Sequence, residues 1–307
     1  MPDNVFLGFD GGGTKTEAVL LDAAGTELAR ALSGPSNPLR VGFDTAFESL
    51  TAAARETLAA AGAAPENVRG VCAGLAGAGR PAVVKLVEPF LKKMFPHALV
   101  HVTADFTVAL EAAAGAGPGV VLIAGTGSCA FGRNSDGRFA RAGGYGPWVG
   151  DEGSAYDIGR QAVSAVLHAR DTLAPSTLLE EQLLPALELS DWGELIERIA
   201  KNPDAVFPNL FPLVVRASDE GDEVARKILN TAAGALGRIA GSVIISLGLR
   251  KEKFPLAKCG GVFGHSAHLE AKLGALLANF APAATLFDLR DSPALGAARL
   301  ALRLSAT

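Results

Sequence analysis

The run Gly8-Phe9-Asp10-Gly11-Gly12-Gly13-Thr14-Lys15-Thr16 combines an aspartate, consecutive glycines, hydroxyl side chains and a lysine. Short apolar runs rich in strand formers flank it, which predicts a strand, a glycine turn and a second strand. Consecutive glycines can adopt conformations closed to other residues and expose backbone N–H groups to an anion. The run therefore predicts a phosphate-binding hairpin, with a plain glycine-rich hairpin as the alternative.

Two common phosphate loops do not match this run. A Walker A loop would have lysine where this chain has Thr14. A dinucleotide-binding loop would have glycine at Thr16 and would continue as a helix, whereas the next residues favour a strand. Phosphate binding at this hairpin therefore requires another kind of fold.

A second stretch of the chain has the same order of features. Val120–Ala124 is an apolar strand, Gly125-Thr126-Gly127-Ser128 is a glycine turn, and Cys129–Gly132 is another strand. Both stretches continue through a further turn, at Gly25 and at Gly137, into a third strand. The repeat predicts two α/β domains of similar core, with a nucleotide in the cleft between them, held by one glycine hairpin from each.

Glycine and proline clusters set the predicted domain limits. The cluster Gly115-Ala116-Gly117-Pro118-Gly119 predicts a boundary between a first domain, 1–117, and a second domain, 118–291. Amphipathic helices from about Ser176 to Ala200 predict a helical insertion in the second domain.

The composition of the chain limits the classes of function that we expect. The chain has 307 residues, 49% hydrophobic and 20% charged, which is typical of two globular α/β domains. The net charge is −4 without a Lys/Arg cluster, and apolar runs fall short of about 20 residues, so we expect no nucleic-acid partner and no membrane.

The N-terminus has no basic segment, which predicts no signal peptide. Cys72, Cys129 and Cys259, far apart and odd in number, predict reduced thiols in a cytoplasmic protein and match no zinc spacing.

Asp105 follows a predicted strand, Ala98–Val102, and precedes a helix predicted from Thr107. One interpretation is a helix N-cap that stabilises the protein by about 1 kcal/mol. The other is a general base that takes a proton from a substrate hydroxyl as that hydroxyl attacks the γ-phosphate of ATP. Open α/β sheets bind ligands at the carboxyl ends of strands, so beside two phosphate loops we favour the base.

Asp151 and Asn37 each have a structural and a ligand-binding interpretation. In the first, Asp151 or Ser154 caps the next helix; in the second, the Asp151 carboxylate binds vicinal sugar hydroxyls. Asn37 lies between Ser36 and Pro38, and is either a turn residue or a donor and acceptor for a ligand.

The remaining candidates concern the nucleotide. Asp10 either satisfies N–H groups of the hairpin or holds Mg²⁺ through water. Lys15 is either a solvated charge or a phosphate partner, and the sequence favours neither. The turn Gly260-Gly261-Val262-Phe263-Gly264 has no large polar side chain, so it is either a simple turn or a surface that adenine approaches closely.

Together these motifs resemble the N-acetylglucosamine kinases of the BadF/BadG/BcrA/BcrD ATPase family, within the actin-like superfamily. The resemblance runs from about residue 5 to residue 300 and is weakest between 170 and 255. It rests on Asp10–Thr14, Asn37, Thr103–Asp105, Gly125–Ser128 and, above all, Gly150–Tyr156. It implies two ribonuclease-H-like domains that close over ATP, with the C-terminal helix, 292–305, returning to the first domain.

The resemblance also implies roles for individual residues. Asp105 would be the base for the sugar 6-hydroxyl and would contact the sugar. The nucleotide would be held by Gly12, Gly13, Thr14, Lys15, Thr126, Gly127, Gly260, Gly261, Val262, Phe263 and Gly264. The amino sugar would contact Asn37, Ser128, Cys129, Gly144, Tyr145, Gly146, Pro147, Trp148 and Asp151.

The predicted activity is therefore phosphorylation of an amino sugar by ATP with Mg²⁺, most simply of N-acetylglucosamine at its 6-hydroxyl. Two departures lie near the sugar pocket: Gly144-Tyr145-Gly146-Pro147 replaces the Gly-Gly-Trp-Gly-His of mammalian members, and Leu39 replaces an aromatic residue. Glucosamine and N-acetylmuramic acid therefore stay open as alternative substrates. A homodimer is the family's expected assembly.

Two alternatives come from other functional classes. An ATPase activator of a 2-hydroxyacyl-CoA dehydratase needs paired cysteines for an iron–sulfur cluster, which the spacing of the three cysteines does not supply. A sugar-sensing repressor needs a DNA-binding helix-turn-helix, which the residues before Val5 do not supply.

Overall fold

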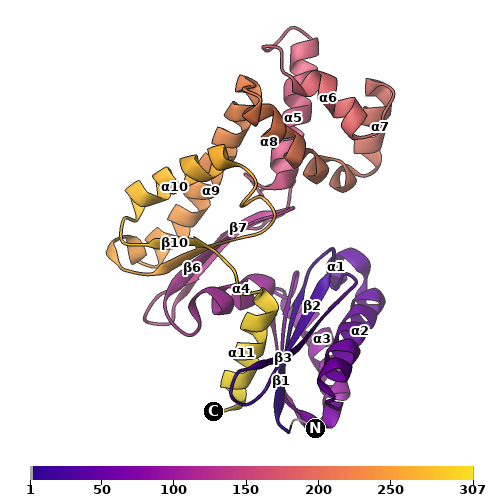
Figure 1. Cartoon of the computed structure of the whole chain (residues 1–307), viewed down its shortest axis with the longest axis vertical. Coiled ribbons are helices and arrows are strands. Elements are labelled where there is room, and N and C mark those ends of the chain that lie inside the picture. Colours follow the sequence, from indigo (N-terminus) through magenta and orange to yellow (C-terminus); the bar gives the residue numbers. More distant parts are fainter. Residues whose placement is uncertain (1–2, 307) are drawn as a thin grey trace. The chain divides into compact units, whose positions relative to one another are not determined.

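The computed structural model describes residues 3–306, which divide into two compact units (Figure 1). The first unit comprises the residues up to Gly117 and those from Leu289 onward, and the second is Pro118–Asp288. Each unit contains one five-stranded sheet with helices packed on it. The predicted α/β class with two domains is confirmed.

The first sheet has the order β3-β2-β1-β4-β5. Strands β1, β2 and β3 pair antiparallel, whereas β4 and β5 run parallel to β1. The strands are β1 Val5–Gly11, β2 Thr16–Leu21, β3 Glu27–Ser33, β4 Val68–Leu75 and β5 Leu99–Ala104. The helices are α1 Pro38–Val41, α2 Phe43–Ala61, α3 Pro81–Met94, α4 Asp105–Ala114 and α11 Pro293–Ser305, with a 3-10 turn at Pro65–Asn67.

Alternation along β1 places its side chains in two cores, because successive residues of a strand point to opposite faces of the sheet. Leu7 and Phe9 are buried with apolar residues of α2 and α3. Phe6 packs on the other face with residues of α4 and α11. Helix α2 has the bounds that the helical spacing of its apolar residues predicts.

Helix α11 lies against β1 at a glycine. A methyl group at Gly8 would lie 2.1 Å from the backbone nitrogen of Ala298 and 2.3 Å from the backbone oxygen of Ala294. The alanines of α11 that make this contact are buried. The last helix of the chain therefore completes the core of the first unit through close backbone packing.

Replacing Gly8 by alanine is expected to destabilise the protein by about 3 kcal/mol, because the methyl group meets backbone atoms that can yield only if α11 moves away. Gly274→Ala is the matched control. A methyl group there meets no atom within 4 Å in the interior of α10 (Ala267–Phe280), so stability should be unchanged or rise by up to about 1 kcal/mol. Urea denaturation midpoints measure both, and a wild-type midpoint for Gly8→Ala would contradict the packing.

The second sheet repeats the first. Its order is β10-β9-β6-β7-β8; β6, β7 and β8 pair antiparallel, and β9 and β10 run parallel to β6. The strands are β6 Gly119–Ala124, β7 Ser128–Arg133, β8 Phe139–Gly143, β9 Pro255–Cys259 and β10 Thr285–Asp288. The helices are α5 Ala155–Arg170, α6 Leu179–Ala186, α7 Trp192–Lys201, α8 Phe211–Asp219, α9 Glu223–Ser246 and α10, with 3-10 turns at Pro203–Ala205, Phe207–Leu210 and Leu249–Lys251. The two units of similar core expected from the repeat are thus present, with the ribonuclease-H-like architecture that the resemblance implies.

Some element limits differ from the predicted ones. Helix α4 begins at Asp105 rather than Thr107, because the Asp105 carboxylate accepts from the Phe106 N–H and suits the first turn of a helix. The prolines in Pro203–Pro212 predict a break between helices, whereas this segment forms 3-10 turns and the first residues of α8. The sequence pattern predicts neither α10 nor β10, a four-residue strand at the edge of its sheet.

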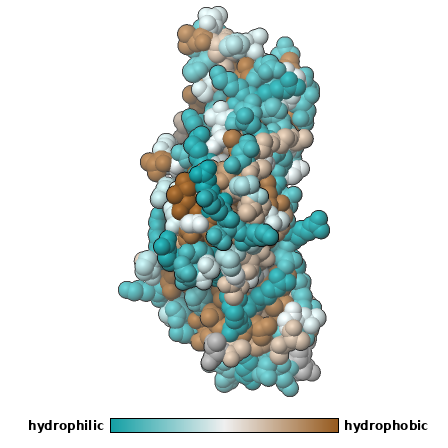
Figure 2. Space-filling model, turned by 90° about the vertical axis from the view of Figure 1, so that its left-hand side faces the viewer, coloured by the Kyte–Doolittle hydropathy of each residue, from teal (hydrophilic) through white to brown (hydrophobic). Residues whose placement is uncertain are grey.

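The face displayed in Figure 2 mixes hydrophilic and hydrophobic residues. One helix of the described chain, α9, is long and apolar enough to cross a membrane by length and composition. More than half of its most apolar window, 56%, is buried inside the protein. This is weak support for a membrane span, because the core helix of a globular domain passes the same test.

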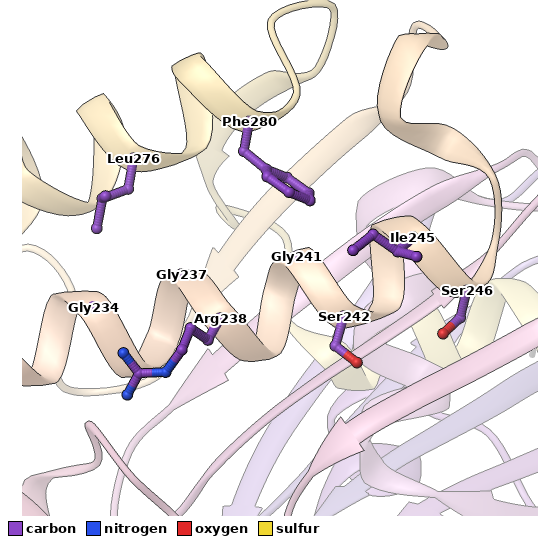
Figure 3. A pocket seen from close by; sticks show the side chains of 9 residues that line it. All are labelled: Gly234, Gly237, Arg238, Gly241, Ser242, Ile245, Ser246, Leu276 and Phe280. Atoms are coloured by element: carbon purple, nitrogen blue, oxygen red, sulfur yellow. The ribbon is translucent and has the colours of Figure 1, made fainter.

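Helices α9 and α10 lie side by side through small residues (Figure 3). Gly237 of α9 faces Leu276 of α10, and Gly241 faces Phe280. The exposed side of this contact is a groove of about 560 Å³, lined by Gly234, Gly237, Arg238, Gly241, Ser242, Ile245, Ser246, Leu276 and Phe280. The residues predicted to bind sugar or nucleotide lie elsewhere in the fold.

Candidate active site

The first glycine turn joins β1 to β2 and is fixed by backbone hydrogen bonds. The Gly12 N–H donates to the Lys15 carbonyl at 2.9 Å. The Gly12 carbonyl accepts from the N–H groups of Ser36 and Asn37, each at 3.0 Å. Within the first unit, the predicted sugar ligand Asn37 therefore lies against the predicted phosphate turn, which also carries Thr14.

Two of the glycines of this turn, Gly11 and Gly13, leave space for side chains of a later segment. None of Gly11, Gly12 and Gly13 has a φ in the left-handed region, which corrects the expectation that they adopt conformations closed to other residues. A methyl group at Gly11 would lie 2.0 Å from Oγ of Ser36, and one at Gly13 would lie 2.8 Å from Nη1 of Arg40. A methyl group at Gly12 would meet a single atom within 4 Å, at 3.7 Å, so this part of the turn is open to a ligand.

Asp10 and Asp105 interact at the ends of β1 and β5. The pKa of Asp10 is raised to about 7, first by burial and then by the charges of Asp105 and Glu17, while Lys15 opposes the shift. Asp105 is the first residue of α4, and the capping position is held by Ala104, so Asp105 is not the N-cap. Its Oδ1 accepts from the Phe106 N–H at 2.9 Å. The structure therefore places the predicted base and the predicted metal ligand close enough to influence each other's charge.

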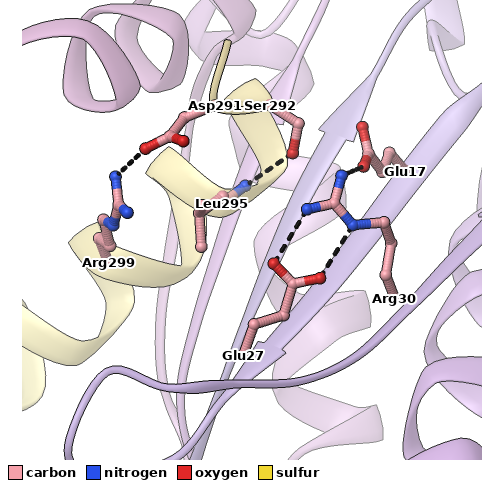
Figure 4. Close-up of polar contacts among 7 residues, drawn as sticks. All are labelled: Glu17, Glu27, Arg30, Asp291, Ser292, Leu295 and Arg299. Carbon is pink, nitrogen blue, oxygen red and sulfur yellow. Dashed lines mark hydrogen bonds and ion pairs between the residues drawn. The ribbon is translucent and has the colours of Figure 1, made fainter.

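Glu17, next to Asp10, is neutralised by an arginine (Figure 4). Glu17 is the register partner of Asp10 across β1 and β2, and it is buried. Nη1 of Arg30 donates to Glu17 at 2.7 Å, while its Nε and Nη2 donate to the two oxygens of Glu27 at 3.0 and 2.9 Å. Arg30 is thus engaged by two carboxylates and compensates the Glu17 charge within the sheet.

Asn37 fulfils the turn role that its neighbours predict. Its Oδ1 accepts from the Leu39 N–H at 3.1 Å and caps the single turn of α1. The cap uses the side-chain oxygen, which leaves the amide nitrogen as the group able to donate to a ligand. The structural and the ligand-binding interpretations of Asn37 are therefore compatible.

The second glycine turn, between β6 and β7, is joined to the segment Gly150–Tyr156. The Gly125 N–H donates to the Gly127 carbonyl at 2.9 Å, with Thr126 between them, and the Ala155 N–H donates to the Gly125 carbonyl at 2.8 Å. The Ser128 hydroxyl donates to the Glu152 carbonyl at 2.8 Å. The predicted phosphate turn and the segment on which the resemblance mainly rests are thus one hydrogen-bonded structure.

Asp151 lies in this segment and has two unusual features. Its φ is +62°, a left-handed value that non-glycine residues rarely adopt, and its side chain is buried. Its Oδ1 has no hydrogen-bond partner among the described residues, although backbone groups of Ser128 and Gly146 bond to the carboxylate. The cap of α5 is Ser154, which accepts from the Asp157 N–H. A strained, buried carboxylate with an unused oxygen can accept a hydrogen bond from a ligand hydroxyl.

The titration of Asp151 gives a test that does not depend on activity. Burial raises the pKa of Asp151 above the ordinary value of an aspartate. Its contribution to stability is therefore complete below about pH 4, the unfolded pKa, and is lost as pH rises through the folded pKa. We expect the stability difference between wild type and Asp151→Asn to change across this window by about 1.4 kcal/mol for each unit of pKa shift. Thermal unfolding of both proteins from pH 4 to 8 measures it, and parallel curves would contradict the raised pKa.

The loop after β8 carries the other predicted sugar contacts. A methyl group at Gly144 would lie 3.1 Å from Cβ of Cys129, so these two residues are adjacent. Tyr145 and Trp148, on either side of Gly146 and Pro147, are 68% and 86% exposed. The Arg141 guanidinium lies 5.4 Å from the Tyr145 ring centre. The structure thus brings Cys129 and Gly144 together, while both aromatic rings project into solvent.

The predicted adenosine turn lies next to the second glycine turn. The Val262 N–H donates to the Ala124 carbonyl at 3.0 Å, and Gly260, at φ +110°, has no room for a side chain against that carbonyl. The side chains of Val262 and Phe263 are buried. A methyl group at Gly261, within this turn, would meet no atom within 4 Å, so the turn is open there; contact with adenosine stays a prediction.

An ion-pair network holds this turn and was not predicted. Glu270 accepts from the Gly264 N–H at 3.0 Å and pairs with Lys258, which also pairs with Asp288 at 2.8 Å. Burial alone would lower the pKa of Lys258, but the hydrogen bonds from Asp288 and Glu270 outweigh it and raise that pKa. A lysine inside the apolar strand β9 is the one signal in the sequence that could have indicated the network.

Metal-binding clusters of three or more His, Cys, Asp or Glu side chains are absent from residues 3–306. Magnesium is commonly held by one or two carboxylates, with water and substrate phosphates completing its shell. Asp10, a part-buried carboxylate beside an open glycine turn, fits that pattern. None of the three cysteines forms a disulfide, and Cys72 is buried in the first unit.

Comparison with known proteins gives concordant matches. The sequence model of the BadF/BadG/BcrA/BcrD ATPase family matches residues 7–301. An N-acetyl-D-glucosamine kinase of Dictyostelium discoideum is 36% identical over 98% of this chain and 99% of its own length. An N-acetylmuramic acid/N-acetylglucosamine kinase of Clostridium acetobutylicum is 31% identical over 96% and 97%. A crystal structure of a provisionally named N-acetylglucosamine kinase of Chromobacterium violaceum superposes with a TM-score of 0.76, at 26% identity over 98% and 100%.

Proposed function

Because the chain belongs to the BadF/BadG/BcrA/BcrD ATPase family, we propose that it transfers the γ-phosphate of ATP to the 6-hydroxyl of an amino sugar, N-acetylglucosamine first. ATP is the phosphate donor and a small sugar is the acceptor. The enzyme acts in the cytoplasm, where ATP is supplied.

The observation that carries the proposal is the Asp151 carboxylate. Its strained backbone, its burial and its unpartnered Oδ1 have a stability cost that a sugar hydroxyl donating to this oxygen would offset. Ser128, whose backbone bonds to this carboxylate, and Cys129 with the adjacent segment Gly144–Trp148 supply the rest of the sugar contacts in the second unit. Asn37 supplies the contact from the first unit.

The transfer itself requires a base, an acceptor oxygen and a held phosphate. Asp105 takes the proton from the 6-hydroxyl, the oxygen forms a bond to the γ-phosphorus, and the bond from that phosphorus to the β–γ bridging oxygen breaks to release ADP. Thr14 and the N–H group of Gly13 bind phosphate in one unit, next to Gly12, whose own N–H donates within the turn. Thr126 and Gly127 do so in the other, and Gly260–Gly264 holds the adenosine.

Magnesium would be held at Asp10 and would supply positive charge against the phosphate oxygens. The raised pKa of Asp10, about 7, describes the protein without a cation, and a cation favours the ionised carboxylate. Lys15 lies beside this carboxylate and adds a further positive charge at the turn.

A panel of sugars in a coupled ADP-release assay tests the proposal. We expect N-acetylglucosamine to stimulate ADP release, and phosphorus NMR of the product to show a phosphate ester at the 6-position. Glucosamine and N-acetylmuramic acid belong in the panel because relatives carry these names. ADP release that no amino sugar stimulates would overturn the proposed function.

The dehydratase-activator alternative needs a cysteine pair that can hold an iron–sulfur cluster. Cys72 is 0% exposed in the first unit, and Cys129 and Cys259 lie on β7 and β9 with β6 between them. We therefore expect the purified protein to be colourless, which an absorbance spectrum checks.

A further inference from the structure

Arg40 lies on the first glycine turn, at a place that the proposed reaction does not yet use. A methyl group at Gly13 would lie 2.8 Å from Nη1 of Arg40 and 3.0 Å from its Cδ. The absence of a side chain at Gly13 thus provides the space in which the arginine side chain lies. Glycine at this position therefore lets the Arg40 side chain lie directly against the turn.

The second unit has the equivalent arrangement. A methyl group at Gly127 would lie 2.7 Å from Oδ2 of Asp151, so this glycine provides space for the carboxylate assigned to the sugar. Gly13 and Gly127 are both in turns that join the first two strands of their sheets. One turn therefore accommodates an acidic side chain and the other a basic one.

The backbone fixes Arg40 in this position. The Gly12 carbonyl accepts from both Ser36 and Asn37, and the Arg40 N–H donates to the Asn37 carbonyl at 3.0 Å. The Thr16 hydroxyl donates to the Gly34 carbonyl at 2.7 Å and forms a second hydrogen bond, also 2.7 Å long, with the Ser36 hydroxyl, which ties the same segment to β2. Arg40 is exposed, and no carboxylate of residues 3–306 lies within ion-pair distance of it. Its guanidinium is therefore available to an anion at the turn.

We propose that Arg40 binds the terminal phosphate of ATP and stabilises the charge that this phosphate carries during transfer. The inference rests on the proposed function. A guanidinium presents several N–H donors in one plane, which matches phosphate oxygens. Asp10 and Asp105 place two carboxyl groups at this end of the first unit, so a phosphate bound there requires positive charge close by. The alternative anion for Arg40 is the carboxylate of an acidic amino sugar, in place of the ATP phosphate.

Arg40→Met and Arg40→Lys test the proposal, with Arg55→Met as the matched control, because Arg55 is exposed on α2 of the same unit. We expect Arg40→Met to lower kcat with N-acetylglucosamine by about 10²-fold, with little change in KM for the sugar, and Arg40→Lys to recover part of that loss. Arg55→Met should match wild type. An unchanged kcat for Arg40→Met would overturn the proposal.

Calorimetry of nucleotide binding without sugar separates the sources of the oxyanion. Arg40→Met should bind ATP more weakly while its affinity for ADP stays at the wild-type value, because the two nucleotides differ in the terminal phosphate. An equal loss for ATP and ADP, or a loss of turnover confined to N-acetylmuramic acid, would overturn the assignment to that phosphate. This binding comparison holds even if no sugar in the panel is phosphorylated, so failure of the proposed function and failure of the Arg40 assignment are distinguishable.

Discussion

Asp105→Asn is expected to lower sugar-dependent turnover by about 10³-fold while the affinity for ATP stays within about 2-fold of wild type. The amide keeps the size of the side chain and an oxygen that can accept from the Phe106 N–H, so the start of α4 is preserved. What it loses is the ability to take a proton from the attacking hydroxyl. Steady-state kinetics with N-acetylglucosamine and calorimetry with ATP measure the two quantities.

The matched control for this variant is Asp44→Asn. Asp44 is the acidic residue in the first turn of α2, as Asp105 is in α4, and it is exposed. Both substitutions remove a negative charge from a helix N-terminus, which costs about 0.3–1 kcal/mol of stability. If both variants lose similar stability but only Asp105→Asn loses activity, the result would support Asp105 as the general base. Turnover preserved in Asp105→Asn would show that the carboxylate serves only the helix.

The strands of both glycine hairpins were predictable because short runs of strand formers and glycine turns are local signals. Helix α2 was predictable over its whole length because its apolar residues recur at helical spacing. The second hairpin repeats the order of strands and turns of the first, and this repeat in the sequence indicates a duplicated fold. Asp105 was predicted as the base because it follows a strand, where α/β sheets bind ligands.

What was not predictable depends on contacts between residues that are separated in sequence. The expectation that Gly11–Gly13 adopt special backbone angles was wrong; instead, Gly11 leaves space for Ser36 and Gly13 for Arg40, side chains from a later segment. Arg40 reaches the turn only because the Gly12 carbonyl accepts from that segment. Similarly, Lys258 and Glu270 meet because β9 and α10 fold together.

Asp151→Asn is expected to lower kcat/KM for the sugar by about 10²-fold, mainly through a higher KM, because a carboxylate is a stronger acceptor for sugar hydroxyls than an amide. Stability should move in the opposite direction. Burial of the charge destabilises the folded protein, and an asparagine at this position removes that cost while its oxygen can still accept from the backbone of Ser128 or Gly146.

The opposite signs separate a ligand-binding role of Asp151 from a structural one. A carboxylate that only supported the segment Gly150–Tyr156 would lose stability and activity together when replaced. If the carboxylate serves to bind the sugar, the Asp151→Asn protein should lose activity but gain, or at least retain, thermal stability at neutral pH. Substitutions at functional sites commonly have this pair of effects. Asp171→Asn, an exposed change at the C-terminal end of α5, should alter neither quantity. Unfolding temperature and sugar KM measured on the same preparations therefore decide whether Asp151, with its strained backbone and unused oxygen, binds the substrate.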